Sequence, residues 1–217
     1  MTHPIFLGRF ENTLAQQKLQ QPDWDEAKAY VLDRLSNELS PDLYYHGIHH
    51  TRDDVLPAAE RLAALAQLDE ANTFLLRTAA LYHDIGYIVQ YEANEALAAG
   101  IAERTLPQFG YRLDQIQAIK GIIMATKLPQ CPKNLLEMLM CDSDLDTLGR
   151  DDFFTTSLNL RKELEARGEK ITTRAWYKRQ LKFLAKHTYF TTVAQALRET
   201  GKQKNIGKLR HLIESLS

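Results

Sequence analysis

The sequence predicts an all-α fold, a helical bundle with a C-terminal helical extension. Three observations lead to this prediction. Apolar residues recur at the three- and four-residue spacing of helices along most of the 217-residue chain. Residues that commonly cap helices precede several of these patterns, and Gly or Pro follows them. Convincing alternation of apolar and polar residues is lacking, since the closest strand candidate, residues 85–91, contains Gly86.

The first half of the chain is expected to form four helices, with patterns over residues 27–39, 50–66, 74–82 and 92–106. Asp23 and Glu26 are three residues apart, the spacing of an N-cap and its reciprocal partner at the start of the first helix. Asp69 is the expected cap of the third helix. Gly86 closes that helix, as glycine commonly does just past a helix end.

The second half carries four further helical patterns, over residues 113–123, 132–140, 153–166 and 175–198. Gly168 is the expected stop of the third of these. The last pattern is expected to bend near His187 and to stop before Gly201, which a polar stretch follows. We interpret a basic cluster in and after this stretch as solvated surface: Lys202, Lys204, Lys208 and Arg210.

Composition limits the classes of function. Apolar residues make up 44% of the chain, which is enough for an ordinary globular core. Lys and Arg number 27 against 28 acids, a net charge of -1. A nucleic-acid-binding protein would usually show a basic excess, so no nucleic-acid partner is expected. A small anionic substrate remains compatible with this charge, because a few local cations suffice for one phosphate.

The two cysteines, Cys131 and Cys141, do not form a C-x-x-C pair, and they are interpreted as free thiols in a reducing compartment. Residues 1–18 lack a basic region followed by an apolar run, so no signal peptide is expected there. No apolar stretch approaches the roughly 20 residues of a membrane helix. We therefore expect a soluble, cytoplasmic protein without a membrane partner, and the sequence leaves a homodimer open.

A His-Asp pair, His83-Asp84, ends an apolar helical pattern and is the first feature that indicates chemistry. An acid and an imidazole at the end of such a run should be largely buried, and a divalent cation is a good partner for buried charge. Adjacent helical residues point about 100° apart, so both can reach one ion only where the backbone turns at a helix end. Gly86 makes such a turn possible.

Histidines precede this pair, and acids follow it. His46 and His50 are four residues apart and share a face if this stretch is helical. Asp142, Asp144 and Asp146 also end an apolar helix, and at most one or two of these alternating acids can point into one site. Imidazoles together with carboxylates suit manganese, iron, zinc or magnesium with open water positions, and do not suit a closed structural zinc site.

The order of these blocks resembles the HD superfamily of metal-dependent phosphohydrolases. The blocks begin with His50-Thr51, continue with residues 81–87 and end with residues 141–149. The resemblance covers at least residues 40–165, and residues 123–127 resemble a bacterial branch of predicted phosphohydrolases in particular. It implies a single HD-type domain with its core at about residues 40–165 and a helical extension over residues 170–217. It also implies four metal ligands: His50, His83, Asp84 and Asp144.

The resemblance further implies hydrolysis of a phosphomonoester or phosphodiester, with a nucleotide as the expected substrate. The metal would activate water, and Asp84 would bridge to or position that water. His46 matches a histidine that protonates the leaving oxygen in related cyclic-nucleotide phosphodiesterases, although a merely polar role stays open. Asp144 is preferred to Asp142 as the last ligand, because the family aspartate usually precedes a Leu or a basic residue.

Four residues are candidates for binding the substrate. Lys127 and Arg150 flank the expected site in sequence, and each could bind phosphate or simply be solvated. Gln180 and Phe183 lie three apart on one helix face and are similar to a Gln-x-x-Phe that grips the purine in cyclic-nucleotide phosphodiesterases. The favoured alternative for this pair is a surface glutamine and a core phenylalanine.

Two other functions belong to the same resemblance. An HD-type di-iron oxygenase usually needs extra histidines between the His-Asp pair and the last Asp, and residues 85–143 contain none. A degenerate HD domain that serves as a regulatory or binding module would have no need of a complete set of buried ligands.

Overall fold

A computed structural model describes residues 22–216, and every regular element in that range is helical, which confirms the all-α prediction. The expectation about a leader in residues 1–18 lies outside the described residues. The elements follow in the order α2 (Trp24–Glu38), η1 (His50–Val55), α3 (Leu56–Leu65), α4 (Glu70–Tyr82), η2 (Ile85–Ile88), α5 (Asn94–Thr105), η3 (Leu106–Phe109), α6 (Leu113–Met124), α7 (Leu135–Asp144), η4 (Asp146–Gly149), α8 (Phe153–Ala166), α9 (Thr173–Lys186) and α10 (Thr192–Ser215).

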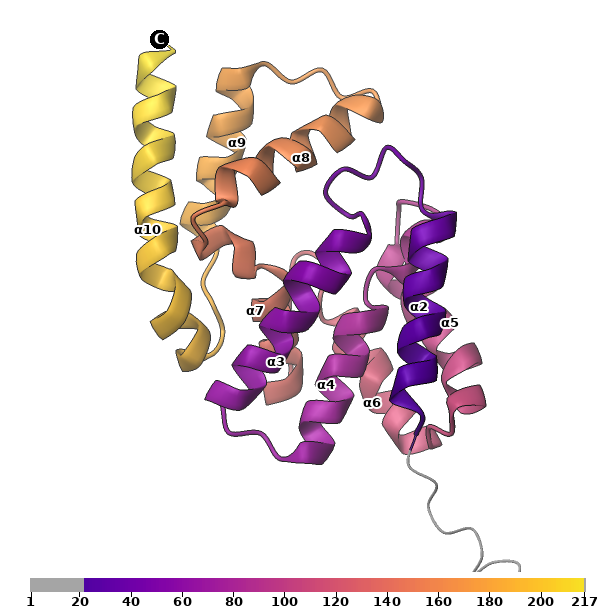
Figure 1. Cartoon of the computed structure of the whole chain (residues 1–217). Helices are drawn as coiled ribbons and strands as arrows, with labels where there is room; N and C mark the ends of the chain where they lie inside the picture. The colour runs from indigo at the N-terminus through magenta and orange to yellow at the C-terminus, as the bar shows by residue number, and fades with distance from the viewer. Residues whose placement is uncertain (1–21, 217) are drawn as a thin grey trace, which may run out of the picture.

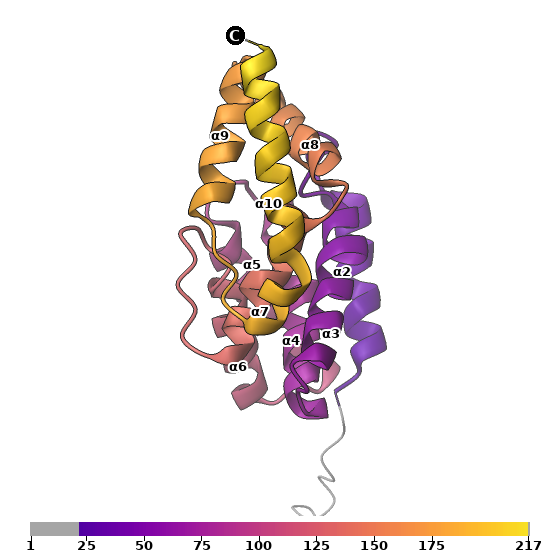
Figure 2. The same ribbon diagram turned by 90° about the vertical axis from the view of Figure 1, so that its left-hand side faces the viewer.

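Two apolar cores hold these helices together. The larger core joins the helices from α2 to α7, with α4 packed against α3, α6 and α7 (Figure 1). The smaller core joins η4, α8, α9 and α10 around Leu148, Phe153, Leu184 and Leu209. The helices α9 and α10 run side by side in both views (Figures 1 and 2). The candidate site lies at the boundary of the two cores, because its side chains come from the ends of elements in the first core and its cavity extends to helices of the second.

The predicted caps at the first and third helices are present. The Asp23 carboxylate accepts a hydrogen bond from the Glu26 amide at 2.9 Å, and Asp69 accepts one from the Asn72 amide at 2.7 Å. These bonds satisfy amides that a helix start leaves without a partner. The helix predicted over residues 153–166 has those bounds in the structure.

The helix expected over residues 50–66 begins with a π-helical turn, η1, and becomes an ordinary α-helix only at Leu56. Pro57, in the first turn of α3, has no amide hydrogen to donate into the preceding turn. The amide of Leu56 instead bonds the carbonyl of Thr51, five residues back. The wider turn therefore occurs where His50 enters the fold.

Residues 85–91 contain no strand. Ile85–Ile88 form the short 3₁₀ helix η2, and the role of Gly86 is a close approach between segments. A Cβ atom at Gly86 would lie 2.0 Å from the carbonyl oxygen of Asn94, the first residue of α5. Only glycine allows this contact, which brings Asn94 at the start of α5 beside Asp84.

The C-terminal helical pattern is two helices, and the prediction that it stops before Gly201 is wrong. Residues 187–191 separate α9 from α10, and α10 continues through Gly201 to Ser215. A Cβ atom at Gly201 would lie 2.0 Å from the carbonyl oxygen of Gly149, so this glycine permits the close packing of α10 on η4 and does not end the helix.

The basic cluster of this stretch is only partly solvated. Lys204, Lys208 and Arg210 are exposed as predicted, but Lys202 is buried. Its ammonium group donates to the carbonyl of His187 at 2.7 Å and pairs with Glu199 at 2.9 Å. Among the described helices, none has both the length and the apolar character that crossing a bilayer would need.

Candidate metal centre

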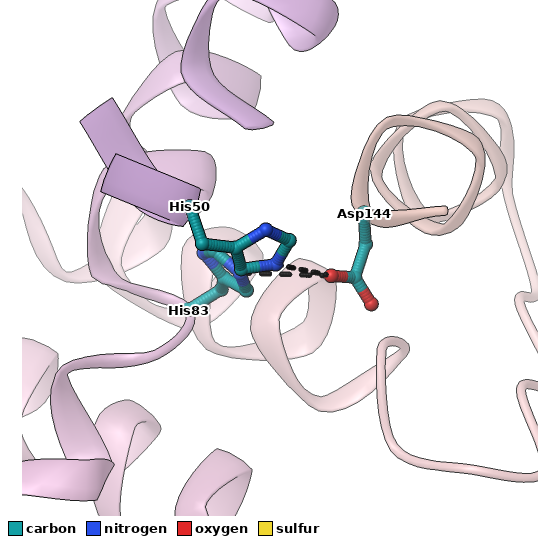
Figure 3. A group of neighbouring side chains, drawn as sticks. All are labelled: His50, His83 and Asp144. Atoms are coloured by element: carbon teal, nitrogen blue, oxygen red, sulfur yellow. Dashed lines mark hydrogen bonds and ion pairs between the residues drawn. The ribbon is translucent and has the colours of Figure 1, made fainter. Parts of the chain in front are cut away.

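Three side chains from three separate elements meet in one buried cluster. His50 is the first residue of η1, His83 is the C-cap of α4, and Asp144 is the last residue of α7 (Figure 3). Asp144 Oδ1 lies 3.3 Å from His50 Nε2 and 3.7 Å from His83 Nε2. One ligand atom from each residue falls within 4.8 Å of the others, so the group could hold a metal ion.

Asp84 adds a second carboxylate beside the same imidazoles. Its Oδ2 atom lies 3.2 Å from His83 Nε2 and 3.7 Å from His50 Nε2. The amide group of Asn94 donates to the other oxygen, Oδ1, at 3.1 Å. Asn94 thereby directs Oδ2 toward the histidines, and the contact at Gly86 places Asn94 where it can do so.

The orientation of His83 leaves a ligand atom free. Its Nδ1 atom lies 2.7 Å from the carbonyl oxygen of Ala80. A carbonyl only accepts, so Nδ1 carries the hydrogen, and in the neutral ring Nε2 presents a lone pair. Within residues 22–216, neither His83 Nε2 nor Asp84 Oδ2 has a hydrogen-bond partner, and both atoms are buried. Buried polar atoms seldom remain without partners, and a divalent cation would satisfy both.

The electrostatics of this pair agree with a cation site. Burial raises the pKa of Asp84. The adjacent His83 and the other nearby histidines together lower this pKa by more than burial raises it, so the net shift is strongly downward. Burial lowers the pKa of His83, but Asp84 and then Asp144 raise it, and the net shift is upward. The Asp84 carboxylate is therefore held ionised, and it favours positive charge at the position between the rings.

The three alternating acids have three different roles. Asp142 accepts hydrogen bonds from the Phe190 amide at 2.8 Å and from the amide and hydroxyl of Thr191 at 2.9 and 2.6 Å. Asp146 is bound by Arg198 at 2.7 Å and by Arg61 at 2.9 Å. The structure thus groups Asp144 with the histidines and uses Asp142 to fix the start of α10.

His46 lies beside the cluster and is held by a residue that sequence reasoning missed, Glu163 of α8. Glu163 is fully buried, and its Oε1 atom lies 2.5 Å from His46 Nδ1. The other oxygen accepts from the backbone amides of Tyr45 and His46 at 2.8 and 3.0 Å. In the sequence Glu163 resembles the nearby acid Glu165, and only the fold shows that Glu163 is buried beside Leu164.

A cavity of about 500 Å³ opens from the cluster toward α8 and α9. Asp84, Asp144 and His46 line one end, and Gln180 and Phe183 line the wall that α9 provides. Gln180 is 7% exposed, contrary to the favoured surface placement, and no group in the described part of the chain bonds its amide. Phe183 is half-buried and packs against the smaller core. The structure therefore brings the predicted Gln-Phe pair to the cavity.

The two cations suggested for phosphate do not line this cavity. Lys127 is exposed on the segment after α6. Arg150 donates to Asp54 at 2.5 Å and forms a second ion pair with Asp152. Asp54 Oδ2 lies 3.9 Å from His50 Nδ1, so Arg150 belongs to the layer of residues behind His50.

No family model matches the chain, and no curated protein is found as a relative. The resemblance to the HD superfamily therefore depends on the ordered sequence blocks, and the metal-binding interpretation depends on the geometry of the four side chains.

Proposed function

We propose that the protein is an HD-type metal-dependent phosphohydrolase, which cleaves a phosphomonoester or phosphodiester of a nucleotide. The observation that carries the proposal is the pair of buried acceptor atoms His83 Nε2 and Asp84 Oδ2, which lie 3.2 Å apart beside His50 and Asp144 at the end of a cavity. Two acceptors at this distance repel each other unless a proton or a cation lies between them, and a divalent cation would satisfy both.

His50, His83, Asp84 and Asp144 would hold the divalent cation. Such a cation polarises a phosphoryl oxygen and lowers the pKa of water, which is the chemistry that phosphoester hydrolysis needs. Asn94 and the Ala80 carbonyl hold Asp84 and His83 in the orientation that ligation requires. Mixed nitrogen and oxygen donors are compatible with manganese, iron, zinc or magnesium.

His46 would carry the proton that the leaving oxygen takes up. Glu163 fixes the imidazole through Nδ1, and stacking on the Tyr87 ring at 4.5 Å between centroids fixes its plane. Burial raises the pKa of Glu163. Its bonds with His46 and with nearby amides lower this pKa by more than burial raises it, so the carboxylate remains ionised. A fixed imidazole at the edge of a cavity has the arrangement expected of a general acid.

The nucleotide part of the proposal is supported by Gln180 and Phe183. A glutamine amide without a partner can both donate to and accept from the edge of a base, and a phenyl ring can stack on its face. Both residues line the cavity that contains His46 and Asp144.

The decisive experiment measures metal and hydrolysis on the same samples. Wild-type protein, His83→Ala and His211→Ala are incubated with manganese, desalted and analysed by elemental mass spectrometry, then assayed on a panel of nucleotides. We expect bound manganese and hydrolysis in the wild type and in His211→Ala, whose substitution lies on the exposed face of α10. His83→Ala should lose both. Folded wild-type protein that takes up no metal would overturn the proposal.

A further inference from the structure

We propose that the cavity selects a singly charged phosphodiester with an apolar or aromatic ester group, in preference to doubly charged phosphomonoesters and polyphosphates. This inference rests on the proposed function and narrows its substrate class. It is argued from the charges and the apolar surfaces that surround the cavity.

Acids outnumber cations in the lining. Four carboxylates line the cavity: Asp84, Glu95, Asp144 and Glu169. Arg179 is the single Lys or Arg of the lining within residues 22–216. It donates to Glu169 at 2.8 Å, and both side chains are about half exposed, so this ion pair lies toward solvent. No unpaired cation of the described lining is available to a phosphate.

Two further arginines lie near the cavity but do not line it. Arg150 is neutralised by Asp54 and Asp152, and Arg167 is an exposed residue whose guanidinium lies over the ring of the lining residue Tyr91 at 3.6 Å. A divalent cation at the metal site would be balanced by the carboxylates of Asp84 and Asp144. The second negative charge of a phosphomonoester would then be buried near acids with no partner, which is unfavourable at low dielectric.

The rest of the wall is apolar. The apolar lining residues are Leu145 and Leu148 of the α7–η4 segment, Leu160 and Leu164 of α8, and Phe183 of α9. A cavity of about 500 Å³ is in the range that encloses one small organic molecule. An ester group that buries apolar surface against these side chains would contribute binding that inorganic phosphate cannot.

The first test compares ligands that differ only in charge and apolar surface. Dissociation constants are measured by calorimetry, with the manganese-loaded protein at pH 8, for diphenyl phosphate, phenyl phosphate and dimethyl phosphate. We expect diphenyl phosphate to bind at least about tenfold more tightly than either of the others. Phenyl phosphate carries a second negative charge at this pH, and dimethyl phosphate has no aromatic rings. Equal or tighter binding of phenyl phosphate, or of a nucleoside triphosphate, would overturn the inference.

The second test adds a cation to the wall. Leu160→Lys introduces an ammonium group from a half-buried position of the lining, and Leu158→Lys introduces the same group on the same helix at a position that is 41% exposed and outside the lining. Leu160→Lys should improve the binding of phenyl phosphate roughly tenfold relative to wild type, whereas Leu158→Lys should not change it. Identical behaviour of the two variants would contradict the charge argument.

Hydrolysis assays separate this inference from the proposed function. A protein that binds manganese and hydrolyses p-nitrophenyl phosphate faster than bis(p-nitrophenyl) phosphate would retain the proposed function and refute the diester preference. A protein that binds manganese and binds diphenyl phosphate selectively, but hydrolyses neither ester, would refute the proposed function and support the selectivity of the cavity.

Discussion

The imidazole of His46 and the carboxylate of Glu163 lie 2.5 Å apart, although 117 residues separate them in the chain. Glu163 also accepts the hydroxyl of Tyr91 at 3.0 Å and the amides of Tyr45 and His46. One buried carboxylate on α8 therefore orders the segment that leads into His50. The C-terminal helices take part in the site through this contact as well as through the cavity wall.

We predict that the effect of replacing His46 on the rate of hydrolysis depends on the leaving group of the ester. His46→Asn should lower kcat about 100-fold or more for a phosphodiester with an alcohol leaving group, because the departing alkoxide needs a proton. The same variant should hydrolyse a p-nitrophenyl ester at close to the wild-type rate, because p-nitrophenolate leaves unprotonated. Glu163→Gln should follow the same pattern with smaller losses.

The control for Glu163→Gln is Glu165→Gln, which removes a carboxylate from the same helix at a surface ion pair with Arg161. Steady-state rates on the two ester types, with thermal melts to verify folding, measure the effect. Equal losses on both types of ester would show that His46 only supports the structure.

Replacing Asp144 and Asp142 of α7 one at a time by Asn should distinguish the residue that binds metal from the residue that stabilises the fold. Asp144→Asn should reduce manganese affinity and leave the urea unfolding of chelator-treated protein nearly unchanged. Asp142→Asn should lower the free energy of unfolding by about 2 kcal/mol, because three donors at the start of α10 lose a charged acceptor. Its manganese content should stay close to wild type. The reverse assignment of the two effects would mean that Asp142 is the ligand.

Two glycines of α10 provide a matched pair for stability. A methyl group at Gly201 would collide with the Gly149 backbone, whereas nothing lies within 4 Å of the Cβ position at Gly207. Gly207→Ala should stabilise the protein by about 1 kcal/mol through helix propensity alone. Gly201→Ala should destabilise it by about 2 kcal/mol or more, because backbone cannot move aside easily. Urea unfolding of both variants measures the difference, and a gain of stability for Gly201→Ala would contradict the packing argument.

His187 should make stability depend on pH. Burial, together with the nearby Lys202, lowers the pKa of His187 to about 4, and neither ring nitrogen has a hydrogen-bond partner among the described residues. His187 therefore binds a proton near pH 6.5 in the unfolded chain, but only near pH 4 in the folded chain. The free energy of unfolding should fall as the pH drops through this window, by at most about 3 kcal/mol.

The His187 effect is obtained from the difference between variants. His187→Gln should lose less stability than wild type between pH 7 and pH 4 in chelator, while His211→Gln, exposed on α10, should follow the wild-type curve. Parallel curves for His187→Gln and wild type would show that His187 titrates normally in the folded protein.

Local signals were sufficient for most of the helices. The α8 pattern has an apolar face, a start after Asp152 and a stop near Gly168, and its bounds matched the prediction. The candidate ligands lie at the ends of helical elements in ordered blocks, so the sequence blocks indicated which side chains meet. Asp144 was separable from Asp142 only through the family pattern, and the structure adds the reason, which is that Asp142 serves a helix start 48 residues away.

Contacts distant in sequence could not be predicted in the same way. Gly201 suggested a helix end because its partner, Gly149, lies in another element. Glu163 resembled one more surface acid until α8 placed it against residues 45 and 46. Arg150 suggested a phosphate ligand because the sequence does not reveal that Asp54 and Asp152 already neutralise it. In each case the partner in space determines the role of the residue.

The π turn at His50 makes the direction of the His50 side chain independent of the direction of the buried face of α3. In an ordinary helix the one would fix the other. In an α-helix every residue advances by about 100°, so the direction of His50 would be fixed by the buried residues of α3 that follow it. The bond from the Leu56 amide to Thr51 inserts extra backbone between them. Deleting one exposed residue of this turn, such as Asp53, would restore the α-helical phase and rotate His50 away from Asp144 while α3 kept its packing. The loss of a single codon could therefore remove His50 from the candidate metal centre and still leave a folded protein.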